Sequence, residues 1–215
     1  MSVISFRSRR TADEDAYART KRSASSLIYA VRRGTDGTIS EPHFDELELE
    51  LTVGSRWAPT MGGEGARFYA TREAKIRIGP KESIVVETAE LICVPYNVMG
   101  VVFPKGSLFR EQGVHPLTAK IDPSWQGHLR VLLRNSGDTP RELKQGSPIA
   151  SVVFWSLDMT LHNPMRFKDA ELPTVRLSKW RRMLALVERP AIAMVLGSSV
   201  AAALTTYVTI KFAGG

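Results

Sequence analysis

The chain has 215 residues and a formal net charge of +7, with hydrophobic and charged fractions of 43% and 24% that are typical of a soluble globular protein. Its single cysteine, Cys93, excludes a disulfide framework and a cluster of thiolate metal ligands, and we expect it to be a small buried core residue. The four histidines show no metal-ligand spacing, so the sequence does not support zinc-dependent hydrolysis or deamination.

The N-terminal segment, residues 1–25, alternates short basic and acidic runs and ends in the small polar stretch SASS. This pattern predicts a solvated, mobile arm, and its acidic residues argue against a transit peptide. Much of the positive charge of the chain lies here and in a second basic block near the C-terminus. Since that second block directly precedes an apolar segment, the charge indicates a membrane surface, and we expect no nucleic-acid partner.

Residues 26–165 are predicted to form one mainly β domain. Residues 46–53 (ELELELTV) place Leu47, Leu49, Leu51 and Val53 on one face and acidic residues on the other, as in a half-buried strand. Six further strand candidates follow at residues 75–78, 83–87, 91–94, 100–103, 128–134 and 149–155. Turns rich in Gly and Pro separate them and no convincing helix lies among them, which favours a sandwich or a barrel. No G-x-G-x-x-G is present, so a Rossmann or P-loop fold is not supported.

The C-terminal part is predicted to contain a linker with a basic juxtamembrane helix over residues 166–189 and a transmembrane helix over residues 190–211. Residues 190–210 carry no charge and, as a helix, are long enough to cross a ~30 Å hydrocarbon layer. Basic residues crowd the N-terminal flank, which by the positive-inside rule places the preceding domain in the cytoplasm. We therefore expect a single-pass, tail-anchored membrane protein; a buried core helix is the alternative.

Five motifs occur in a fixed order between Ile39 and Leu157. They are ELELTVGSRW, IRIGPKESIVVETAELICVPYNVMGVV, KGSLFREQG, LTAKIDPSWQGHLRV and LKQGSPIASVVFWSL. Together they resemble the motifs of the dCTP deaminase and trimeric dUTPase superfamily. The resemblance implies a distorted β-barrel or jelly roll that forms a homotrimer and binds a deoxynucleotide or a related nucleotide. It implies no required cofactor, although Mg²⁺ could accompany a bound triphosphate.

The resemblance also assigns a nucleotide site. The turn KGSLFR corresponds to the phosphate-binding turn, and the hairpin LTAKIDPSW corresponds to the hairpin that wraps the base and sugar. The residues implied are Lys105, Gly106, Ser107, Arg110, Thr118, Ala119, Asp122 and Trp125. Without the family order, the same turn would read as a Gly-Ser turn with solvated cations.

The catalytic positions of the resembling deaminases are substituted here. Leu132 lies where those enzymes have the glutamate that activates water, and Gly106 lies where they have a serine. In the dUTPase branch the aspartate of the hairpin activates the water, and Asp122 occupies that position, although an aspartate there is structural in deaminases. Ser151 replaces an expected glutamine, the step from Thr118-Ala119 to Ile121-Asp122 is one residue shorter than usual, and the dUTPase C-terminal arm is absent.

Three hypotheses follow. The first is a membrane-tethered, trimeric nucleotide-binding protein without deaminase activity, acting as a sensor, scaffold or effector. The second is a divergent but active dCTP deaminase or dUTP diphosphatase of deoxynucleotide metabolism, in which Asp122 and Mg²⁺ take part in dUTP hydrolysis. The third is a purely structural trimeric barrel.

Overall fold

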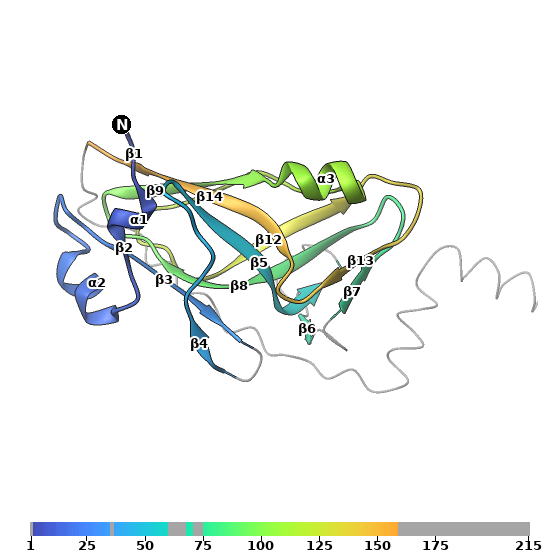
Figure 1. Ribbon diagram of the computed structural model, residues 1–215, viewed down its shortest axis with the longest axis horizontal. Helices are drawn as coiled ribbons and strands as arrows, with labels where there is room; N and C mark the ends of the chain where they lie inside the picture. Colours follow the sequence, from blue (N-terminus) through green and yellow to red (C-terminus); the bar gives the residue numbers. More distant parts are fainter. Residues whose placement is uncertain (1, 35–36, 60–67, 71–74, 159–215) are drawn as a thin grey trace, which may run out of the picture. The chain divides into compact units, whose positions relative to one another are not determined.

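The computed structural model describes residues 2–34, 37–59, 68–70 and 75–158 (Figure 1). The chain divides into two units, Met1–Val175 and Arg176–Gly215, and the second unit lies outside the described residues. The linker, the juxtamembrane helix and the membrane span expected from residue 166 onward lie outside them as well. Among the residues that are described, none of the helices has the length and hydropathy that a membrane crossing requires.

The described chain is mainly β, as the sequence predicts. The strands are β1 (Ser2–Val3), β2 (Arg10–Thr11), β3 (Ile28–Arg33), β4 (Ile39–Ser40), β5 (Glu48–Ala58), β6 (Tyr69–Ala70), β7 (Lys75–Ile78), β8 (Ser83–Cys93), β9 (Val98–Pro104), β10 (Val114–Pro116), β11 (Ala119–Ile121), β12 (Gln126–Asn135), β13 (Arg141–Lys144) and β14 (Pro148–Ser156). Three short helices accompany them: α1 (Phe6–Arg9), α2 (Glu14–Thr20) and α3 (Gly106–Gln112).

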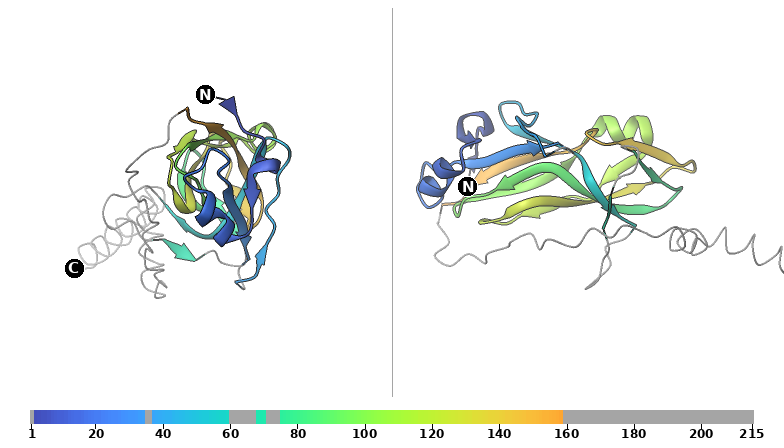
Figure 2. Two further views of the ribbon diagram at one scale, coloured as in Figure 1. Left: turned by 90° about the vertical axis from the view of Figure 1, so that its left-hand side faces the viewer. Right: turned by 90° about the horizontal axis from the view of Figure 1, so that it is seen from below.

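The long strand β5 joins two layers of sheet. Its first half pairs with β14, with Glu48 opposite Val153, and its second half pairs with β8, with Trp57 opposite Val86. Layer A thus contains β1, β14, β9, β11 and the first half of β5; layer B contains the second half of β5 with β8, β12, β10 and β3. The end-on view in Figure 2 shows the strands wrapped around one interior.

The two layers share one apolar core. Val152 and Phe154 from layer A and Val131 and Leu133 from layer B are buried in the same cluster. The hydrogen-bonded path nevertheless runs from β10 to β11 and stays open, because these two end strands do not pair with each other. The predicted barrel is therefore not closed among the described strands. A small second sheet, β7 with β13, completes the strand pairing.

All of the predicted strands exist: β7 has the predicted bounds, β5 begins two residues later and extends to Ala58, and the others are longer. The candidates at 83–87 and 91–94 are one strand, β8, and the face prediction for residues 128–134 is confirmed, because Leu129, Val131 and Leu133 are buried. Leu47 is an exception to the predicted apolar face, since it is exposed in the turn before β5. The sequence does not predict the strands β1, β2, β3, β4, β6, β10, β11 and β13 or the three helices α1, α2 and α3.

The N-terminal segment is folded onto the sheets, which differs from the predicted mobile arm. β1 pairs with β14, and the fully buried Phe6 stacks on Phe154 with ring centroids 5.4 Å apart. Tyr17 of α2 is also buried, and its hydroxyl donates to the carbonyl of Val94. Two aromatic side chains set among the charges thus tie this segment to the core, because burying each removes a large apolar area from water.

Cys93 is only partly buried, which differs from the predicted core position. It packs against the outer cluster of Tyr17, Tyr29 and Val31. Desolvation raises the pKa of its thiol to about 12. The thiolate, which is the nucleophilic form, is therefore scarce at neutral pH.

Two buried carboxylates lie on β8. Glu90 accepts hydrogen bonds from the backbone N–H and the hydroxyl of Thr52, both at 2.7 Å, and burial raises the pKa of its carboxyl. Glu87 accepts from Nε and Nη2 of Arg56, at 2.7 and 2.5 Å. Both pairs connect β8 to β5 and so fix the strand that joins the layers.

Candidate functional site

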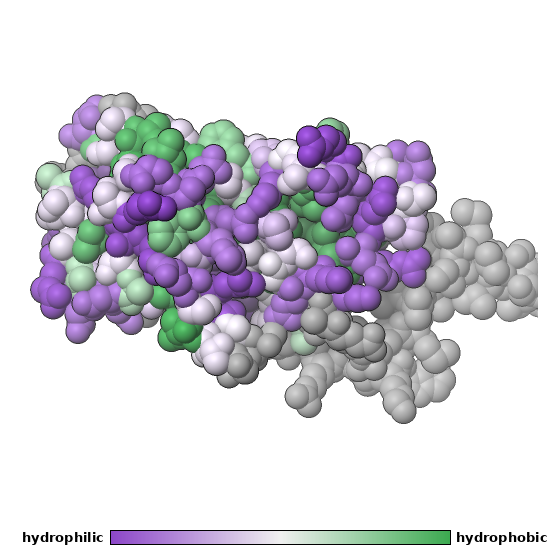
Figure 3. Space-filling model, viewed as in Figure 1, coloured by the Kyte–Doolittle hydropathy of each residue, from purple (hydrophilic) through white to green (hydrophobic). Residues whose placement is uncertain are grey.

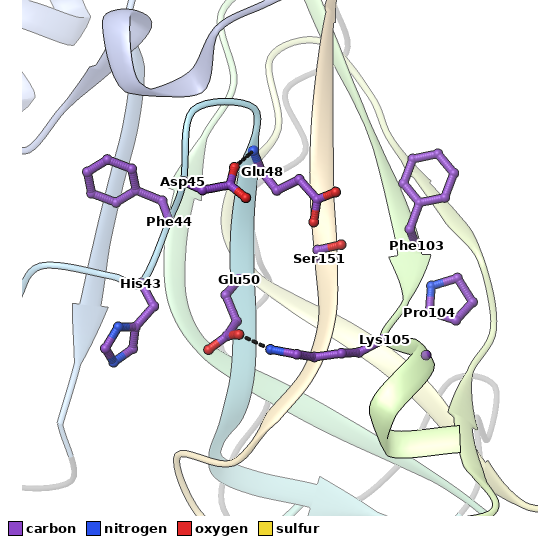
Figure 4. A pocket seen from close by; sticks show the side chains of 10 residues that line it. His43, Phe44, Asp45, Glu48, Glu50, Phe103, Pro104, Lys105 and Ser151 are labelled. Atoms are coloured by element: carbon purple, nitrogen blue, oxygen red, sulfur yellow. Dashed lines mark hydrogen bonds and ion pairs between the residues drawn. The ribbon is translucent and has the colours of Figure 1, made fainter. Parts of the chain in front are cut away.

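An open pocket of about 650 Å³ lies on the outer side of layer A (Figure 4). Its walls come from the segment before β5, from β5 itself, from β14 and from the end of β9. The lining residues are His43, Phe44, Asp45, Glu48, Glu50, Phe103, Pro104, Lys105, Gly106 and Ser151. Two of the predicted site residues, Lys105 and Gly106, are among them.

A tight turn forms one wall of this pocket. The backbone N–H of Asp45 donates to the carbonyl of Glu48, and the N–H of Glu50 donates to the carbonyl of His43. The Asp45 carboxylate closes the turn by accepting from the N–H groups of Leu47 and Glu48, both at 2.8 Å. These two hydrogen bonds, that from Glu48 first, lower the pKa of Asp45, so the carboxylate is charged at neutral pH.

Strand pairing places the opposite wall. Ser151 of β14 lies opposite Glu50 of β5 on one side and opposite Phe103 of β9 on the other, so the three side chains form one row across layer A. Lys105 follows β9 directly, and its ammonium group forms an ion pair with Glu50 (Figure 4). Both side chains of this pair are about one-third exposed, at 32% and 27%.

The predicted phosphate-binding turn is the start of α3. Gly113 ends this helix in the left-handed conformation that favours glycine, and buried Leu108 anchors it. Gly106 is exposed, and a Cβ placed on it would meet no atom within 4 Å. Ser107 is half-buried. Arg110 is 79% exposed beside its neighbour Glu111 and does not line the pocket.

The predicted base-binding hairpin lies along the other side of β9. Ala119 pairs with Val102, and Thr118 and Ala119 are exposed. The Asp122 carboxylate forms an ion pair with Lys120 at 2.6 Å. The Trp125 indole N–H donates to the carbonyl of Gly127 at 3.3 Å.

One chain does not bring the turn and the Asp122 end of the hairpin together, although Ala119 of the hairpin pairs with Val102 near the turn. Ile121 pairs with Gly100, and Lys105 follows Gly100 by five residues, which is roughly 16 Å of extended chain at ~3.3 Å per residue. Asp122 and Trp125 therefore lie towards the opposite end of β9 from Lys105. Neither of them lines the pocket.

Leu132 lies in a third place, on the outer side of layer B. It packs against an apolar cluster of Ala58, Phe68 and Val85. The sequence predicts Leu132 as an apolar residue on the polar face of its strand. In the structure, the cluster against which its side chain packs is apolar. The position that resembles the general base of the deaminases is thus filled by a side chain with no ionisable group and with apolar neighbours.

Sequence reasoning missed the acidic wall of the pocket. Glu48 and Glu50 belong to the alternating run ELELELTV, whose pattern predicts that they lie on the solvated face of a strand. Their place beside Lys105 depends on the β5–β14–β9 register, which no local pattern encodes. His43, Phe44 and Asp45 belong to none of the motifs that the sequence offers.

The family model described as dCTP deaminase-like matches residues 65–157. The dCTP deaminase of Thermococcus kodakarensis is 35% identical over 107 residues, which cover 50% of this chain and 68% of that protein. The chain belongs to the dCTP deaminase-like family. The dCTP deaminase of Pyrococcus furiosus is 37% identical over 103 residues, or 48% of this chain and 65% of that protein. A deoxyuridine 5'-triphosphate nucleotidohydrolase of Wolbachia is 29% identical over 96 residues, covering 44% of this chain and 63% of that protein.

The chain spans somewhat less than two thirds of the length of the Pyrococcus furiosus relative. Among solved structures, the dUTPase of Streptococcus mutans aligns over 60% of this chain and 96% of that chain, with 17% identity and a TM-score of 0.45. A score at this level adds nothing to the family membership.

Proposed function

We propose that the chain is a nucleotide-binding protein of this family that does not deaminate dCTP. One observation carries the proposal. The family's phosphate turn opens with Lys105 and Gly106 into a 650 Å³ pocket, whereas the family's general-base position holds Leu132 in an apolar cluster. A ligand site without the base that activates water supports binding and loses the chemical step.

The charge of the pocket favours a nucleotide that brings a cation. Asp45, Glu48 and Glu50 supply carboxylate oxygens, which are the donors that Mg²⁺ takes, usually one or two at a time together with phosphate oxygens. These residues therefore fit a magnesium ion carried on a triphosphate; Asp45 and Glu48 are exposed, and Glu50 is half-buried. Magnesium there would neutralise the repulsion between phosphate and carboxylates. Lys105 would contact a phosphate oxygen.

A complete site in this proposal needs a second copy of the chain. The phosphate turn and Asp122 lie towards opposite ends of β9, so a neighbouring copy would supply the Asp122 end of the hairpin that faces each pocket. The proposed assembly is a homotrimer. Such head-to-tail contacts close into a ring when the rotation between copies allows it.

The outer face of layer A offers an apolar surface for that contact. The rings of Phe103 and Trp155 lie 6.1 Å apart, and Val3 of β1, opposite Trp155, is 50% exposed. Hydrophobic residues gather over β1 and the adjoining sheet in Figure 3. Glu48 flanks this face on β5 and Lys120 flanks it on β11, so opposite charges would meet in a head-to-tail contact.

We expect the full-length chain in mild detergent to sediment as a trimer. Val3→Glu should shift the population towards monomer, because a charge would be buried at the contact. Ile39→Glu is the matched control, since Ile39 is also exposed but lies on β4 away from this face, and it should leave the trimer intact. A wild-type monomer at micromolar concentration contradicts the shared site.

We also propose that residues 190–211 anchor the domain to a membrane, with the nucleotide site on the cytoplasmic side. The charge-free stretch 190–210 and the basic residues before it support the anchor. A binding protein held at a membrane suits a sensor, scaffold or effector of the local nucleotide level.

The experiment that tests the proposed function is a binding and turnover screen of the full-length chain against dNTPs and NTPs, with and without Mg²⁺. We expect saturable binding of at least one triphosphate, and Lys105→Gln should weaken it by about ten- to a hundredfold, the loss of one charge-assisted contact. Glu142→Gln, at an exposed ion pair with Lys75, serves as a charge-change control. Absence of binding by every triphosphate contradicts the proposal and leaves the structural role.

A further inference from the structure

Lys105, a cation that lines the pocket, forms an ion pair with a carboxylate of the protein itself. Lys105 pairs with Glu50, and among the described residues that line the pocket, Lys105 is the one with a permanent positive charge. Arg110, the other cation of the family turn, lies outside the lining beside Glu111. An anionic ligand group that contacts Lys105 must therefore take the place of the Glu50 carboxylate.

The strand register explains why this ion pair forms. Glu50, Ser151 and Phe103 form one row, so Ser151 separates the strand that carries Glu50 from the strand that leads into Lys105. Figure 4 shows the Lys105 side chain reaching across β14 to Glu50, with the short Ser151 side chain nearby. A long side chain at position 151 would occupy part of the space that the lysine crosses.

The charge balance of the pocket is negative once this pair is formed. The charges of Lys105 and Glu50 cancel, which leaves the carboxylates of Asp45 and Glu48 facing the same space. Asp45 is held ionised by two backbone N–H groups. A bare triphosphate thus meets repulsion from two carboxylates and competition from a third.

We infer that Glu50 is a specificity-determining residue of the pocket: it competes with ligand phosphate for Lys105 and so selects polyphosphates that carry a divalent cation over free polyphosphates. This role rests on the proposed nucleotide-binding function. Magnesium bound to the phosphates offsets the carboxylates and gives Glu50 a new partner when Lys105 turns to the ligand. Glu50 therefore raises the dependence of binding on magnesium and lowers the affinity for free polyphosphate.

Inorganic tripolyphosphate is the probe that isolates this effect, because it carries the phosphate charge without base or sugar. Its affinity is measured by calorimetry on the full-length chain in mild detergent, in EDTA and in Mg²⁺. In EDTA we expect Glu50→Gln to bind about tenfold more tightly than wild type, since a competitor and a repulsive charge are both removed. In Mg²⁺ the difference should shrink to about twofold or less.

Three matched variants separate the ion pair from general electrostatics. Glu48→Gln removes a pocket carboxylate that does not pair with Lys105 and should give a two- to threefold gain at most. Glu142→Gln lies on β13 outside the pocket and should give none. Glu50→Gln combined with Lys105→Gln should lose the whole gain, because the gain requires a free lysine.

The possible results of these measurements distinguish the role of Glu50 from the proposed nucleotide-binding function. Equal or weaker tripolyphosphate binding by Glu50→Gln, in a protein whose wild type binds triphosphates in the nucleotide screen, overturns the role of Glu50 and leaves the proposed function standing. A gain of the same size in Glu48→Gln overturns it too, because the effect would then be general repulsion. If neither tripolyphosphate nor any nucleotide binds to any variant, both proposals fall.

Discussion

Replacing Arg56 with leucine is expected to lower the free energy of unfolding by about 3–5 kcal/mol, because the change leaves the Glu87 carboxylate buried without its cation. The Glu87 side chain is only 5% exposed, and Arg56 holds it with two parallel hydrogen bonds. The pair also joins β5 to β8 where β5 passes into layer B. Urea unfolding of the full-length chain in mild detergent, followed by tryptophan fluorescence, measures the change.

A double-mutant cycle gives this prediction its control. Glu87→Leu combined with Arg56→Leu should be far less destabilising than Arg56→Leu alone, because removing both charges also removes the cost of an unpaired buried carboxylate. Lys75→Leu breaks an ion pair whose side chains are 51% and 58% exposed and should change stability by less than about 0.5 kcal/mol. A loss in Arg56→Leu as small as that in Lys75→Leu would show that water reaches Glu87.

The fold could be predicted where a strand has one buried face. The alternation in residues 46–53 and 128–134 is the pattern of a half-buried strand, and β5 and β12 follow it. β10 and β11 could not be predicted this way, because each has three residues and too little length for a period to appear. α3 was missed because its start, KGS, also suits a turn.

The candidate site was predicted less completely than the fold, for a physical reason. Lys105 and Gly106 are recognisable in order along the chain, but their partner Glu50 lies on a strand 55 residues away. Only the pairing of β5 with β14 and of β14 with β9 brings the two side chains together. A motif read along one chain also gives no sign that Asp122 and Lys105 lie at opposite ends of β9, so the hairpin and the turn were assigned to one site.

Segment 1–25 shows that a highly charged sequence can still contribute side chains to the core. Its basic and acidic runs suggested a solvated arm, yet Phe6 is fully buried against Phe154. Arg10, one of the cations in those runs, lies over the ring of Phe44 and pairs with Glu41. Charged residues of this kind cover a surface while a single aromatic residue between them enters the core.

The largest expected effect is the absence of deaminase activity. The purified full-length chain should bind a nucleoside triphosphate and release no ammonia from dCTP. In resembling deaminases a glutamate at the position of Leu132 activates the attacking water, and loss of a general base costs about 10²- to 10⁴-fold in rate. Leu132 has no ionisable group and packs against Ala58, Phe68 and Val85. Measurable deamination of dCTP by the unmodified chain contradicts this prediction.

Restoring the family residues should have different effects at Gly106 and at Leu132. Gly106→Ser should be tolerated, because a Cβ at Gly106 meets no atom within 4 Å. Leu132→Glu places a carboxyl among apolar side chains, where desolvation favours the neutral form and so lowers the fraction that is ionised and able to accept a proton at neutral pH. The combined variant should therefore recover only a trace of dCTP turnover, and Gly106→Ser with Leu132→Gln, which has the shape without the base, should recover none.

Robust pyrophosphate release from dUTP that disappears in Asp122→Asn would instead assign the chain to the dUTP-hydrolysing branch, because the hairpin aspartate would then be activating water despite its ion pair with Lys120.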